Sequence, residues 1–187
     1  MTRLTTVLLL ALTLAAPVRA HASSARVLPF DDMVGLADEI VVGEVEKSEA
    51  RWQGKLIFTT VTVRVDESLK GQPGARIEIT QPGGTAVHPV LKAPVRMDVA
   101  GESTLQAGER VVLFVERRRP TLRLIVGGAQ GRFTIREDAA APGPAVPVGP
   151  KKLMVQREGA QATLASEAMT LDELRNRIRA VVEEQKR

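Results

Sequence analysis

Apolar and polar residues alternate with a period of two over residues 57–66, which predicts a β-strand with one buried face. The residues expected on that face are Ile57, Thr59, Val61, Val63 and Val65. Shorter β-branched runs predict further strands over 40–45, 76–80, 111–115, 122–126, 132–135 and 151–157. The run 111–115 is apolar at every position, as expected for a strand buried on both faces. Gln53-Gly54 is expected at a hairpin tip.

Helical spacing appears near both ends of the domain. Residues 31–37 predict a short helix, with Asp31 as its N-cap. Thr170 to Glu173 has the capping-box pattern and precedes a single apolar stripe. The stripe comprises Leu174, Ile178, Val181 and Val182. This C-terminal helix spans too few heptads for a coiled coil, so we expect it to pack on the sheet.

Glycines between the short strands, at Gly127, Gly128 and Gly131, suggest sharp bends of the kind found at barrel corners. We therefore expect a mostly β fold: a small β-barrel with a short N-terminal helix and a C-terminal amphipathic helix. The expected organisation is a signal peptide over 1–22, the barrel over 23–136, a Pro/Ala/Gly-rich linker over 137–150, and a strand and helix over 151–187.

The N-terminal residues match a secretory signal peptide. Arg3 precedes an apolar run from Leu4 to Ala16, and small residues around Ala20 and Ala22 follow Pro17. The run is shorter than the roughly 20 residues of a membrane span, so we expect no transmembrane anchor after cleavage. Cleavage is expected after Ala22 or after Ala20, and the mature protein is expected in the periplasm or the medium.

Composition narrows the possible functions. The 187 residues contain no cysteine, so disulfides and thiol chemistry are excluded. The formal net charge is +4, and the loss of Arg3 and Arg19 with the signal peptide lowers it to +2. Nucleic-acid binding therefore has no support from charge.

Four pieces of sequence carry a resemblance to a known family. They are residues 37–45 (ADEIVVGEV), 65–71 (VDESLKG), 108–114 (GERVVLF) and 129–133 (AQGRF). Together they resemble uncharacterised bacterial secreted proteins and the netrin-type module of tissue inhibitors of metalloproteinases. The resemblance implies an OB-like barrel that binds another exported protein, with a protease as one partner class. Those inhibitors chelate the target's zinc through an N-terminal cysteine, and this chain has none, so only the scaffold carries over.

No residue pattern indicates catalysis, and we expect no cofactor. No Gly-x-Ser-x-Gly elbow is present, and the two histidines cannot complete a structural zinc site. The alternative is a ligand- or copper-binding module. If cleavage leaves His21 as the N-terminus, its amine and ring together with His88 could bind copper as a histidine brace.

The segment 82–109 is the expected recognition surface because it is long and lacks clear periodicity. Its candidate interaction residues are Gly83, Gly84 and His88. Arg117, Arg118 and Arg119 form the densest charge run, which is typical of a solvated hairpin end and could also contact an acidic partner. The sequence thus predicts a non-catalytic exported module that binds another protein.

Export has a direct test. Mass spectrometry of the protein from its native host should show a chain that begins at Ser23 or His21, because the signal peptide is removed. Recovery of intact protein containing Met1 from the cytoplasm would contradict the expectation.

Overall fold

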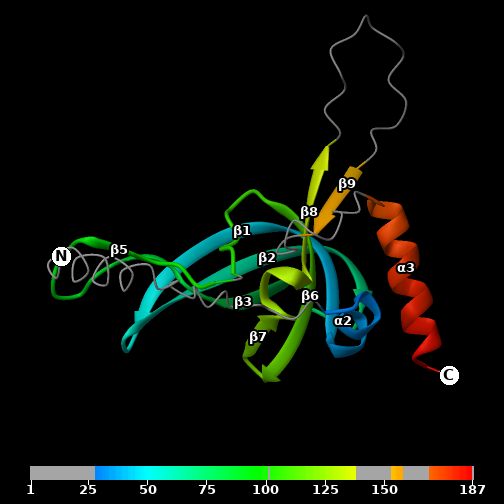
Figure 1. Cartoon of the computed structure of the whole chain (residues 1–187), viewed down its shortest axis with the longest axis horizontal. Helices are drawn as coiled ribbons and strands as arrows, with labels where there is room; N and C mark the ends of the chain where they lie inside the picture. Colours follow the sequence, from blue (N-terminus) through cyan, green and yellow to red (C-terminus); the bar gives the residue numbers. More distant parts are fainter. Residues whose placement is uncertain (1–27, 101, 138–152, 158–168, 187) are drawn as a thin grey trace, which may run out of the picture.

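The computed structural model describes residues 28–100, 102–137, 153–157 and 169–186. The expected signal peptide, with His21, and nearly all of the expected linker lie outside these ranges. The strands are β1 Glu39–Gln53, β2 Leu56–Lys70, β3 Arg76–Pro82, β4 Gly84–Val87, β5 Pro94–Met97, β6 Arg110–Arg119, β7 Leu122–Ile125, β8 Arg132–Glu137, β9 Leu153–Arg157 and β10 Met169–Thr170. The helices are α2 Phe30–Leu36, the 3-10 turn η1 Gly128–Gly131, and α3 Leu171–Glu184. The mostly β fold with two flanking helices is confirmed (Figure 1).

The main sheet is an open, antiparallel one. Its order is β10-β9-β8-β6-β1-β2-β3, and β7 pairs with β6 beside that path. β3 and β7 lie close together, but no strand pairing joins them. The described strands therefore do not show the closed barrel that the sequence predicted. The edge of β6 opposite β1 is divided between β8 at its start and β7 at its end.

β1 and β6 lie at the centre of the sheet, and their paired segments, residues 39–43 and 111–115, are buried on both faces. Ile40, Val42, Val112 and Phe114 pack under the two helices. Residues that alternate with them, among them Val41, Val111 and Leu113, pack in the concave face of the sheet. The expectation that 111–115 is buried on both faces is confirmed.

The register of β2 agrees with the alternation in the sequence. Ile57, Thr59, Val61 and Val63 are at most 1% exposed, while the residues between them are partly exposed. Val65, the last residue expected on the buried face, is only partly buried. The β1–β2 hairpin turns at Gly54, as expected. Both strands run beyond the apolar stretches that predicted them. The tip of their hairpin, residues 52–57, extends past the last residue of β2 that pairs with β3, and we call this hairpin the β1–β2 arm.

Both helices cover the same face of the sheet. In α3, the Thr170–Glu173 capping box is present, and Leu174 and Ile178 are fully buried in the core. In α2, the N-cap is Pro29 and makes no side-chain hydrogen bond. The expected cap, Asp31, lies inside the first turn instead, because the N-cap is two residues earlier than the sequence pattern indicates. No helix in the described part of the chain has the length and apolarity to cross a membrane.

The register of β2 generates a stability prediction. Val63 is 0% exposed, so Val63→Asp buries an unpaired charge and should prevent folding, as judged by circular dichroism and thermal melting. Thr62→Asp places the same charge on the opposite, partly exposed face and should leave a folded protein. Equal melting temperatures for the two variants would contradict this assignment of faces.

Candidate functional site

The segment 82–109 is more ordered than the sequence suggested. Its first half forms the β4–β5 hairpin, a separate two-stranded sheet. Its second half, residues 98–100 and 102–109, returns across the concave face to β6, and we call residues 98–100 and 102–106 the strap. The sequence missed the hairpin because β4 and β5 are only four residues each. The prolines at 89 and 94, which flank its turn, are the signal that could have revealed it.

Two buried polar side chains hold the strap in place. The Gln81 side chain accepts a hydrogen bond from the Leu105 amide (3.1 Å) and donates one to the Ser103 carbonyl (3.2 Å). Arg132, only 4% exposed, donates to the Ser103 hydroxyl (2.8 Å) and to Glu109 (3.0 Å). Leu105 is fully buried in the core of the concave face. The strap is therefore a fixed element.

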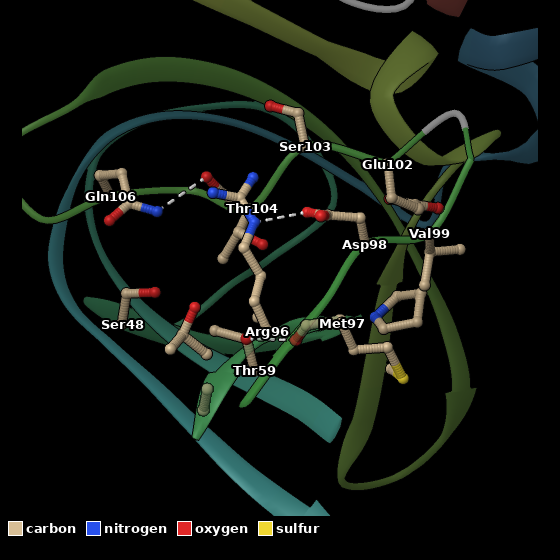
Figure 2. A pocket seen from close by; sticks show the side chains of 15 residues that line it. Ser48, Thr59, Arg96, Met97, Asp98, Val99, Glu102, Ser103, Thr104 and Gln106 are labelled. Atoms are coloured by element: carbon tan, nitrogen blue, oxygen red, sulfur yellow. Dashed lines mark hydrogen bonds and ion pairs between the residues drawn. The ribbon is translucent and has the colours of Figure 1, made fainter. Parts of the chain in front are cut away.

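The strap and the base of the hairpin enclose a pocket of about 590 Å³ (Figure 2). Its floor comes from β1 and β2, through Ser48, Ala50 and Thr59. The other lining residues are Pro82, Gly83, Gly84, Thr85, Arg96, Met97, Asp98, Val99, Glu102, Ser103, Thr104 and Gln106. Most of these side chains are polar, so the pocket differs from the usual apolar small-molecule cavity.

Gly83 and Gly84, two of the expected interaction residues, shape one wall of this pocket. Both have positive φ, 94° and 121°, which side chains rarely allow. A Cβ at Gly84 would lie 2.4 Å from the Thr59 hydroxyl oxygen. That hydroxyl donates a 2.7 Å hydrogen bond to the Gly83 carbonyl. The glycine pair thus lets the chain leave β3 and turn sharply into β4 against the sheet.

The pocket lining has two acidic side chains and one basic side chain. Arg96 and Asp98 form an ion pair at 2.8 Å, and both side chains are 74% exposed. Glu102 forms no ion pair or side-chain hydrogen bond with any described residue. Burial raises the pKa of its carboxyl above the ordinary value. One carboxylate of the pocket lining, which also packs against Gly128 of η1, is therefore not neutralised by any cation of the described chain.

The tip of the β4–β5 hairpin is hydrogen-bonded within its turn and carries exposed apolar side chains. The His88 ring nitrogen Nδ1 accepts hydrogen bonds from the amides of Val90 (3.2 Å) and Leu91 (3.1 Å). The same ring packs edge-on against Trp52 of the β1–β2 arm, with 5.0 Å between ring centroids. Val87, Val90 and Leu91 are nonetheless 61%, 78% and 69% exposed. Figure 1 shows the hairpin extending away from the sheet beside the end of β1.

In the basic run 117–119, two of the three arginines form ion pairs with glutamates of the fold. Arg117 and Arg123 both donate to the Glu39 carboxylate, which is 0% exposed. Arg118 pairs with Glu116, and Arg119 makes no contact of this kind with the described residues. The run lies on the β6–β7 hairpin and does not line the pocket. The structure therefore separates it from Gly83, Gly84 and His88.

Glu39 is the one acidic side chain in the described chain that is fully buried. Burial by itself raises the pKa of its carboxyl, but the hydrogen bonds and positive charges of Arg117 and Arg123 outweigh that effect. The pKa of Glu39 accordingly lies below its ordinary value.

Of the two histidines in the copper site that the sequence suggested, only His88 lies among the described residues. His21 lies outside the described residues. His88 uses Nδ1 for the hairpin turn. Among the described residues, no three His, Asp or Glu side chains gather closely enough to hold a metal ion.

The motif residues that carried the family resemblance have structural roles here. Lys70 donates a 2.7 Å hydrogen bond to the Val34 carbonyl at the end of α2. Asp38 accepts from the Arg117 amide at 2.6 Å. No protein-family model, curated protein or solved structure compared with the chain matches it. The resemblance to the netrin-type module therefore rests on the sequence pattern alone.

The pKa of Glu39 generates a prediction. Glu39→Gln should lower the free energy of unfolding at pH 7 by about 2 to 3 kcal/mol, since two charge-assisted hydrogen bonds are weakened. Because the pKa is lower in the folded state, this stabilisation is complete above the ordinary glutamate pKa of about 4.3 and is lost as the pH falls through the folded value. Urea titrations across this pH range measure the difference.

Glu116→Gln is the matched control, because Glu116 also pairs with an arginine but at a more exposed position. Its cost should stay below about 1 kcal/mol. A Glu39→Gln cost as small as that of the control, or one that does not change with pH, would contradict the assigned role.

Proposed function

We propose that this protein is a non-catalytic exported module that binds another exported protein through the tip of its β4–β5 hairpin. The observation that carries the proposal is the exposure of Val87, Val90 and Leu91 on a turn that is already fixed. Apolar side chains gathered on one protruding tip are typical of recognition surfaces.

The hairpin is held in place before any partner arrives. His88 fixes the turn from within, and its contact with Trp52 fixes the hairpin against the β1–β2 arm. Association therefore requires little ordering of the tip, and more of the contact energy contributes to affinity. Leu56, at the end of the same arm, is also exposed, at 51%.

The charges around the tip define the partner further. Lys92 follows Leu91, Lys55 precedes Leu56, and neither lysine forms an ion pair within the described residues. The surface that best complements this tip is an apolar cleft with an acidic rim. The resemblance to the netrin-type module makes an exported protease the first partner class to examine.

The test uses the mature chain as bait in the secretome of its host. Wild-type protein should capture a partner, and Val90→Ser/Leu91→Ser should weaken binding to that purified partner by about 30-fold or more, the loss expected at an interface hot spot. Leu36→Ser is the matched control, because Leu36 is 54% exposed on α2, away from the hairpin. Its affinity should equal that of the wild type.

Three results would overturn the proposal. The first is that the double variant binds the partner as well as the wild type does. The second is that the Leu36 variant loses as much affinity as the double variant does. Capture of vesicles with anionic lipids, without any protein partner, would assign the tip to a membrane surface. If the partner is a protease, its peptidase activity in the presence of each variant shows whether the module inhibits it.

A further inference from the structure

The pocket at the base of the hairpin is a second potential site, separate from the exposed tip. None of Val87, Val90 and Leu91 lines it. Its volume of about 590 Å³ falls within the range of small-molecule sites, roughly 300 to 1,000 Å³. Its walls are held by Gln81, Arg132 and the glycine pair, so the cavity is preformed.

Hydroxyl groups are the most frequent polar groups that line the pocket. Those of Ser48, Thr85 and Thr104 have no hydrogen-bond partner within the described residues. Gln106 uses its side-chain N–H on the Thr104 carbonyl and keeps its own carbonyl oxygen available. A hydroxyl group can both donate and accept hydrogen bonds, so this lining complements a ligand whose own polar groups both donate and accept.

The charges exclude one class of ligand and favour another. Arg96, Asp98 and Glu102 sum to one negative charge, and the Arg96–Asp98 pair neutralises the only cation in the lining. Figure 2 shows the Arg96 side chain crossing the pocket toward Thr104, with Asp98 beside it. A phosphate or carboxylate would meet net repulsion, whereas a protonated amine could pair with Glu102.

We propose that this pocket binds a small saccharide, neutral or carrying a protonated amine. Hydroxyls of the sugar would exchange hydrogen bonds with Ser48, Thr85 and Thr104, and an amine would lie toward Glu102. Met97, Val99 and Ala50 supply apolar surface for the ring carbons. This site does not depend on the proposed protein partner.

The experiment compares three sugars that share the glucose ring and differ in charge: one is positive, one neutral and one negative. Glucosamine, glucose and glucose 6-phosphate are titrated separately into the isotope-labelled mature protein, and amide resonances of residues 83–106 are followed by NMR. Glucosamine should bind most tightly and glucose about fivefold more weakly, the value expected for one partly exposed ion pair. Glucose 6-phosphate should give no saturable shift.

Two variants locate the binding. In Glu102→Gln, glucosamine and glucose should bind equally, because the carboxylate that separates them is gone. In Ser48→Ala/Gln106→Leu, all sugar binding should weaken about tenfold, while the melting temperature stays near that of the wild type. Val90→Ser/Leu91→Ser should bind the sugars unchanged, which separates this site from the hairpin tip.

The proposal fails if none of the three sugars gives saturable shifts, or if glucose 6-phosphate binds most tightly. It also fails if the sugars shift resonances outside the pocket and Ser48→Ala/Gln106→Leu leaves their affinity unchanged.

Discussion

The burial of residues 39–43 of β1 and 111–115 of β6 on both faces is the constraint on which the rest of this structure depends. Two adjacent segments without a solvent face require cover on each side, and the chain supplies two different covers. Helices α2 and α3 lie on one face, while the curved β2–β3 part of the sheet and Leu105 close the other. Glu39 stands where β1 begins, and its pairing with Arg117 and Arg123 ties the far end of β6 and β7 to that point. A single buried carboxylate thus aligns three strands.

The concave face explains why a long connection could become two candidate sites. Residues 82–109 must travel from the end of β3 back to the start of β6, across the open side of the sheet. Leu105 contributes an apolar plug on the way, and Gln81 and Arg132 satisfy the backbone of the strap around it. The chain between these anchor points and β3 is free to project as the hairpin. The projection gives the exposed tip, and the space between its base and the strap gives the pocket.

The two sites make different physical demands. The tip presents apolar side chains to solvent on a hairpin that is fixed by His88 and Trp52. The pocket instead leaves hydroxyls and a carboxylate without partners in the described chain, and Glu102 is held where burial disfavours its charge. These polar groups are at least partly exposed, so a ligand can reach them without a change in the fold. Both sites are built on a scaffold whose stability comes from elsewhere.

The sequence by itself determined the local features of this protein. The alternation over 57–66 specified which face of β2 is buried, and the apolar run 111–115 specified burial on both faces. Thr170 to Glu173 specified the start of α3. Each of these features depends only on near neighbours in the chain. Only the tertiary structure decided that the sheet is open and that Arg117 pairs with Glu39, 78 residues away in the sequence. It also decided that Gly83 and Glu102 line one pocket, and that the His88 ring packs against Trp52. Those outcomes depend on contacts between segments that lie far apart in sequence. No periodicity or spacing records such contacts, since they form only when the curved sheet brings the segments together.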